Sequence, residues 1–204
     1  VHERDVERVR VPAERVVADR IGLIERDWSE VERQVRAHRR GHLIAGALPL
    51  TAEIAPGVHT LVSRACARLG VTERVELYQS RADGSDGWNA VHIGRHMDAI
   101  VLELRGSAME LLDDDALVSV LGHELGHHLA HSEMRWHWPE RGRGGPRDDV
   151  RLRVSRELTA DRFGLLAEPS LAASLRAEMS LKSGLKSATA RLDVEAYRAW
   201  CTEW

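Results

Sequence analysis

Hydrophobic side chains recur at helical spacing through most of this chain. In residues 1–40 they stand among arginines and glutamates, which predicts one long amphipathic helix, followed by a connection over 41–49. The same period predicts further helices over residues 51–69, 106–112, 114 to 131 or 134, 150–167, 171–181 and 194–204. Gly70, directly after residues 51–69, is typical of a helix C-terminus. The chain is therefore expected to be mostly helical.

Three short segments break the helical pattern and have the composition of strands. They are residues 75–78, 88–93 and 99–104. Polar residues 81–87 separate the first two, and residues 136–146, with three glycines and two prolines, are expected to form a surface loop. All three strands precede the helix over 114–131, so we expect an α+β fold in which a small sheet packs on that helix.

The length of 204 residues and the hydrophobic content of 43% fit one principal globular domain. We expect residues 1–48 to form the amphipathic helix and its connection, and residues 49–204 to form the domain that carries the chemistry. The apolar face of the N-terminal helix needs a cover. It is expected either to pack behind the domain or to lie across its cleft and restrict access.

The helix over 114–131 contains His123-Glu124-Leu125-Gly126-His127. Residues four apart lie one turn above each other, so the two histidines can share one metal ion. Glu124 points about 100° away from His123, close enough to hydrogen-bond a metal-bound water but turned away from direct ligation. An apolar stripe covers the opposite face. The pattern predicts a zinc site; the alternative is a solvated polar patch on an ordinary amphipathic helix.

A catalytic zinc ion normally has three protein ligands and an open position for water. The best third candidate is Glu157, which shares one face of the next helix with Asp161, four residues on. Glu157 can complete the ligand set, and Asp161 can accept the free N–H of a ligand histidine and fix its tautomer. Both could instead belong to a charged helix face. Gly122 and Gly126 lie on one flank of the motif helix, where another backbone could approach closely.

The remaining histidines near these motifs do not fit the ligand set. His128 points well away from His123, and His131 lies two turns on, so both are expected to be solvated or to support the ligands. His92 and His96, near the predicted second strand, are expected to be surface or packed residues.

These motifs resemble those of the gluzincin zinc metallopeptidases of the HtpX and CAAX prenyl protease type. The matching residues are His123-Glu124-Leu125-Gly126-His127, Glu157-x-x-Ala160-Asp161 and Asn89-Ala90, where the family has an Asn-Ala pair beside its substrate-binding strand. The resemblance implies a zincin-like fold and one Zn²⁺ per chain, bound by His123, His127 and Glu157. It also implies that Glu124 is the general base and that Asn89 and Ala90 contribute to substrate binding.

The chain departs from this family in two ways. Many relatives have transmembrane helices, whereas no run here approaches the roughly 20 apolar residues that span a bilayer. The chain therefore resembles a soluble, stand-alone branch, and a prenyl-protein substrate is not expected. Relatives also often place a C-terminal histidine or arginine at the oxyanion, yet no histidine follows His137. Tyr197, Arg191 and Arg156 are the candidates, or zinc alone serves as the electrophile.

Composition narrows the choice of partners. The net charge is −3, and acidic residues are interleaved with the arginines, so no nucleic-acid-binding stripe is expected. Cys66 and Cys201 are far apart and indicate packed free thiols instead of a disulfide framework. The first residues have no signal-peptide core. These features favour a cytoplasmic protein.

The expected activity is that of a zinc-dependent endopeptidase. Its substrate would be a peptide or unfolded protein, bound as an extended strand at the sheet edge near residues 88–93. Two alternatives remain open. One is a zinc-stabilised binding or chaperone-like module with little or no turnover, and the other is a hydrolase of the same zinc class that acts on a non-peptide amide.

Overall fold

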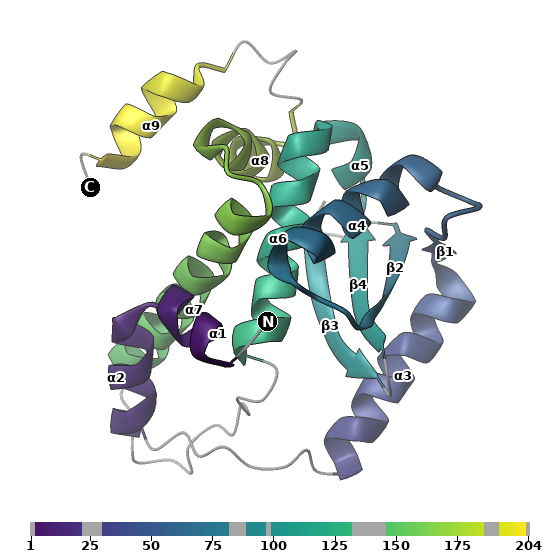
Figure 1. Cartoon of the computed structure of the whole chain (residues 1–204), viewed down its shortest axis with the longest axis horizontal. Coiled ribbons are helices and arrows are strands. Elements are labelled where there is room, and N and C mark those ends of the chain that lie inside the picture. Colours follow the sequence, from purple (N-terminus) through teal and green to yellow (C-terminus); the bar gives the residue numbers. More distant parts are fainter. Residues whose placement is uncertain are drawn as a thin grey trace.

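A computed structural model describes residues 3–21, 30–81, 89–96, 99–131, 146–185 and 192–202. Most of this part of the chain is helical, and one small mixed sheet lies beside the central helix α6 (Figure 1). The elements in chain order are α1 (Glu3–Val9), α2 (Pro12–Ile21), α3 (Glu30–Gly46), β1 (Leu48–Pro49), α4 (Pro56–Leu69), β2 (Arg74–Ser80), β3 (Asn89–His96), β4 (Ala99–Arg105), α5 (Ala108–Leu111), α6 (Asp114–His131), α7 (Pro146–Ala167), α8 (Leu171–Ser183) and α9 (Val194–Thr202). The expected α+β class is confirmed.

The sheet has the strand order β1-β2-β4-β3. Strands β2 and β4 are parallel, while β3 runs antiparallel to β4 and β1 runs antiparallel to β2. Strand β4 is central and buried on both faces, which explains its nearly continuous apolar sequence from residue 99 to 104. Strand β3 is at one edge of the described sheet, as predicted for residues 88–93.

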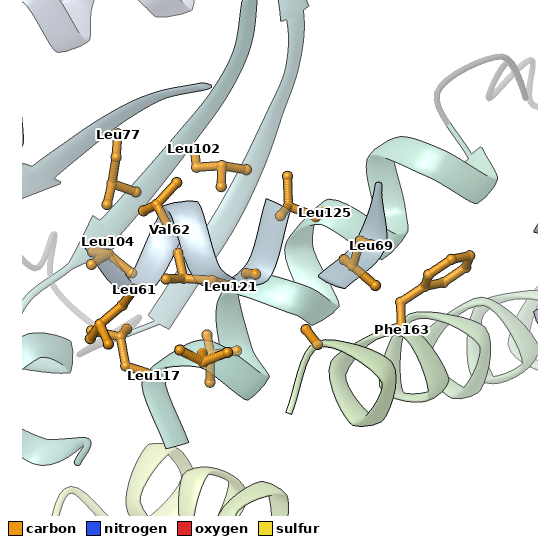
Figure 2. Close-up of a cluster of buried hydrophobic side chains, with 14 of the residues drawn as sticks. Leu61, Val62, Leu69, Leu77, Leu102, Leu104, Leu117, Leu121, Leu125 and Phe163 are labelled. Carbon is orange, nitrogen blue, oxygen red and sulfur yellow. The ribbon is translucent and has the colours of Figure 1, made fainter. Parts of the chain in front are cut away.

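Helices cover both faces of the sheet. One face, with Leu77 and Leu102, packs against leucines of α4 and α6, and Figure 2 shows these side chains converging between the strands and the two helices. The other face, with Tyr78 and Val101, packs against Leu43 of α3. Because α6 forms one wall of this core, its opposite side is free to meet α7, which runs beside it (Figure 1).

The prediction of one long helix over residues 1–40 is wrong. The described part of that region forms three helices, and Pro12 begins the second because proline suits the first turn of a helix but not its interior. Helix α3 also continues to Gly46, through most of the predicted connection. Helices α1 and α2 pack against α6 and α7, whereas α3 packs on the sheet.

The other predicted elements are confirmed with shifted ends. Helix α4 begins at Pro56 instead of residue 51, because the Thr51 hydroxyl accepts a hydrogen bond from the Ile54 N–H in a separate turn. Gly70 ends that helix in the left-handed conformation, with φ of 66°. Residues 82–88 and 132–145, which include most of the predicted turn and surface loop, lie outside the described residues.

Two predictions about the surface can also be checked. Both cysteines are free thiols, but only Cys66 is packed, since Cys201 is exposed. Within the described segments, no helix combines the length and the apolar character that crossing a membrane would need.

Candidate metal centre

Helix α6 brings the two motif histidines together. Their rings meet edge to face with centroids 4.7 Å apart, and their Nε2 atoms lie 3.1 Å from each other. Both side chains are about one-fifth exposed, at 22% for His123 and 21% for His127. The helix begins after Asp113, whose carboxylate caps it by accepting the Ala116 N–H at 2.8 Å. The predicted pairing of the histidines on one helix face is confirmed.

Helix α7 supplies a carboxylate at the same point. Glu157 Oε2 lies 3.4 Å from His123 Nε2 and 3.6 Å from His127 Nε2. Three potential ligand atoms therefore form a nearly equilateral triangle. In a tetrahedral zinc site with bonds of about 2.0–2.1 Å, neighbouring ligand atoms are about 3.3 Å apart. The triangle has the dimensions of one face of such a tetrahedron, so the residues present fit a zinc ion.

Close contact between α6 and α7 places Glu157 opposite the histidines. A Cβ atom at Gly122 would lie 2.3 Å from the Ala167 Cβ, and one at Gly126 would lie 2.6 Å from the Phe163 Cβ. A Cβ at Gly164 of α7 would in turn lie 2.9 Å from a backbone oxygen of α6. The glycines thus let the two helix backbones approach, as expected from their position on one flank of the motif helix.

Asp161 contacts His123 at Nδ1, the ring nitrogen that faces away from Glu157. His123 Nδ1 donates a hydrogen bond to Asp161 Oδ1 at 2.8 Å, because an ionised carboxylate can only accept. In a neutral imidazole this leaves the lone pair on Nε2, the atom that faces Glu157 and His127. Asp161 therefore occupies the position predicted for a residue that fixes the tautomer of a ligand.

The electrostatics of the site favour a cation. Burial alone would lower the pKa of His123, but hydrogen bonds to Asp161 and Glu157 and the nearby charge of Glu124 outweigh it and raise that pKa to about 10. Hydrogen bonds from the two histidines hold the pKa of Glu157 well below its ordinary range. Without a metal, His123 carries a second proton. The resulting positive charge on its ring balances the negative charge of the acceptor atoms around it.

Glu124 is buried, with 8% of its surface exposed, and lies close enough to His123 for its charge to raise the pKa of that imidazole. By contrast, Glu157 and Asp161 have side chains that are 54% and 60% exposed. The candidate metal centre is thus open to solvent on the α7 side and closed around Glu124. The carboxylates of Glu157 and Asp161 are therefore the parts of the site that solvent reaches most easily.

The remaining candidates lie elsewhere. His128 is buried and its Nε2 lies 3.9 Å from Glu73, which excludes the first of its two expected roles, that of a solvated residue. Tyr197 of α9 is close to Glu178 and Lys182 of α8, and buried Arg156 lies near Glu14 and Arg10, so these partners do not place either at the ligand atoms.

Several predicted residues lie outside the described side chains. The side chains of Asn89, Ala90, His92 and His96 lie outside the described part of β3, although its backbone pairs Asn89 with Arg105 and Ala90 with Leu104. Arg191 also lies outside the described residues.

Sequence reasoning missed one residue near the site, Glu14 of α2. It is fully buried beside His131, the histidine that follows His127 by one turn. A signal was present, because Glu14 shares a helix face with Val17, three residues on, which is also buried. A carboxylate on the apolar face of a helix needs a partner.

The chain was compared with protein-family models, curated proteins and solved structures, and none of them matches it.

Proposed function

We propose that this chain is a zinc-dependent peptide hydrolase of the gluzincin type with a zincin-like fold. The observation that carries the proposal is the triangle of His123 Nε2, His127 Nε2 and Glu157 Oε2, with edges of 3.1, 3.4 and 3.6 Å, beside the buried carboxylate of Glu124. Two nitrogen donors and one oxygen donor form a common ligand set for catalytic zinc.

When bound, zinc would supply the Lewis acidity that activates a water molecule and polarises the scissile carbonyl. His123, His127 and Glu157 would hold it, and the solvent-exposed side of Glu157 leaves space for the reacting groups. Glu124 accepts the proton of the attacking water and then delivers it to the leaving amine. Its position supports this role, because the carboxylate is buried and lies close to the proposed ligand His123.

The sheet edge supports a peptide as the substrate. Strand β3 is one of the two edge strands of the described sheet, and helix α6 packs against it. An extended peptide could add to such an edge through main-chain hydrogen bonds, which tolerate many sequences. Asn89 and Ala90 begin this strand and remain the proposed substrate-binding residues.

Metal content and product formation test the proposal together. Protein purified without chelators should contain about one zinc ion per chain, and it should cleave members of a peptide library into fragments that mass spectrometry identifies. Glu124→Gln should retain zinc but lose cleavage, because only its proton transfer is removed. Exposed Glu178 of α8 offers a matched control, and Glu178→Gln should keep both properties.

The outcomes separate the competing functions. Stoichiometric zinc without any cleaved peptide would favour a zinc-stabilised binding module or a hydrolase of non-peptide amides. Less than about half an equivalent of zinc, with no uptake on titration, would reject the metal centre itself.

A further inference from the structure

A second set of polar side chains lies behind His127, on the side away from Glu157. His127 Nδ1 is 3.1 Å from Nδ1 of His131, one turn further along α6. On the far side of that ring, His131 Nε2 lies 3.2 Å from Glu14 Oε1. The Glu14 side chain is completely buried and that of His131 is 8% exposed, so bulk water does not replace these contacts. Three side chains from α6 and α2 thus form a continuous line that ends at a proposed metal ligand.

Other groups of the fold hold Glu14 in place. Arg10 Nη1 donates to Glu14 Oε1 at 2.9 Å, and the Thr159 hydroxyl donates to Glu14 Oε2 at 2.7 Å. Burial raises the pKa of Glu14, but the contacts with His131, Thr159 and Arg10 outweigh it and keep that pKa below its ordinary value. Glu14 is therefore ionised near neutral pH and can only accept hydrogen bonds.

Because Glu14 can only accept, it determines which ring nitrogen of His131, and then of His127, carries the proton. The approach of His131 Nε2 to Glu14 is close but not well aligned, and Nε2 has no hydrogen-bond partner among the residues that the structure describes. Glu14 is thus the acceptor available to a proton on this buried nitrogen. With the proton on Nε2, a neutral His131 has an unprotonated Nδ1, so His127 Nδ1 must donate across the 3.1 Å contact. The lone pair of His127 is then on Nε2, which faces Glu157.

We propose that Glu14 and His131 are positioning residues for His127, and that helix α2 is thereby a working part of the metal centre. The inference rests on the proposed function, since it takes His127 as a zinc ligand. His131 does for His127 what Asp161 does for His123: each accepts the Nδ1 proton and leaves Nε2 free for the metal. The difference is that Asp161 is exposed, whereas the second support is buried and depends on the N-terminal segment.

The N-terminal segment is attached well enough to perform this role. Arg10 Nη2 donates to the backbone oxygen of Ala130 in α6 at 2.8 Å, and the Val11 N–H donates to the Thr159 hydroxyl of α7 at 3.0 Å. Arg162 of α7 donates to the Val9 backbone oxygen at 3.0 Å. These contacts tie the turn between α1 and α2 to both helices that carry the proposed ligands.

Two substitutions of His131 test the orientation directly, with zinc affinity measured by competition with a chromophoric chelator at fixed pH. His131→Leu fills a similar volume but cannot accept the His127 proton, so zinc should bind about 10–100-fold more weakly. His131→Gln keeps an acceptor for His127 and a donor for Glu14, and should restore the affinity to within a few-fold of the unaltered chain. Equal affinity in His131→Leu and the unaltered chain would overturn the inference, as would an equal loss in both variants.

Thr159→Val is the matched control for the packing of α2. It removes the hydrogen bond to Glu14 Oε2 and the one that Thr159 accepts from the Val11 N–H, and it leaves both partners of the contact between His131 and Glu14 Oε1 in the chain. It should lower the thermal unfolding midpoint while the folded protein keeps its zinc affinity. A loss of affinity as large as that of His131→Leu would show that docking of α2, and not the orientation of His127, determines zinc binding.

Histidine NMR of the unaltered chain decides the matter even if the leucine variant does not fold. Nitrogen-15 shifts in the metal-free protein should show His131 with its proton on Nε2 and none on Nδ1, so that Nδ1 can accept a hydrogen bond from His127. A proton on Nδ1 of His131 would overturn the inference. Failure of the unaltered chain to take up zinc would instead reject the proposed function, so the two failures are distinguishable.

Discussion

Replacing Gly122 with alanine should force apart the two helices that carry the proposed ligands. The new Cβ would lie 2.3 Å from the Ala167 Cβ and 3.1 Å from the Phe163 backbone oxygen. Neither contact is the mobile end of a long side chain. Because non-bonded carbon atoms pack at about 3.5–4.0 Å, relief requires α6 and α7 to separate by roughly 1 Å.

The size of the effect follows from two opposing terms. Overpacking of a core costs about 1–3 kcal/mol, and so deep a carbon–carbon overlap belongs at the upper end of that range. Alanine has a higher helix propensity than glycine, so the same substitution stabilises the helix by up to about 1 kcal/mol. We therefore expect the free energy of unfolding of the metal-free protein to fall by about 2 kcal/mol. Zinc ligand distances tolerate shifts of only about 0.2 Å, so displacement of Glu157 should weaken zinc binding at least about tenfold.

Urea unfolding in the presence of a chelator measures the first quantity, and chelator competition measures the second. Gly41→Ala is the matched control, because Gly41 is also inside a helix and its new Cβ would meet nothing within 4 Å. The control should unfold at the same or a higher urea concentration and bind zinc normally. If Gly122→Ala matched the unaltered chain in stability and zinc affinity, the close approach of α6 and α7 would not be what assembles the metal centre.

Three further predictions concern the ligands themselves. Glu157→Ala removes one of three ligand atoms, so elemental analysis should find well under one zinc ion per chain; full occupancy would exclude Glu157 as a ligand. Asp161→Ala should weaken zinc binding by about 10–100-fold while the fold stays largely intact, whereas normal affinity would return Asp161 to an ordinary charged surface. Because the pKa of His123 is raised to about 10, zinc must displace a proton, and its affinity should rise about tenfold per pH unit between about pH 7 and 9. Calorimetry in buffers of different ionisation enthalpy should count about one proton released, and a flat profile would contradict this. The same shift stabilises the metal-free fold fully below the unfolded pKa of about 6.5, and this stabilisation is lost as the pH rises through about 10.

The ligand geometry was predictable because it depends on spacing within single helices. Residues four apart on a helix share a face in almost any fold, so His123 and His127, or Glu157 and Asp161, could be paired from the sequence. That the two pairs meet was predicted from the need of a catalytic zinc ion for a third ligand and from the family resemblance. The close contact of Gly122 with α7 now gives a structural reason for it.

Other features could not be predicted from periodicity. The apolar period continues across Pro12, so it could not show that residues 3–21 form two helices instead of one. The contact between Glu14 and Thr159 joins residues 145 positions apart. A pattern within a window of one helix says nothing about such a pair, even though the buried carboxylate gave a reason to look for it.

The separation between Glu14 and Thr159 also affects the order of events during synthesis. Helices α1 and α2 are synthesised before the partners that hold them, because α6 and α7 follow more than a hundred residues later. Contacts of such long range form late in folding, because a long loop must be closed before they contribute. A nascent chain that has exposed only His123 and His127 still lacks Glu157 and the docked N-terminus. The proposed metal centre can therefore be complete only after α7 has emerged from the ribosome and helices α1 and α2 have docked on it.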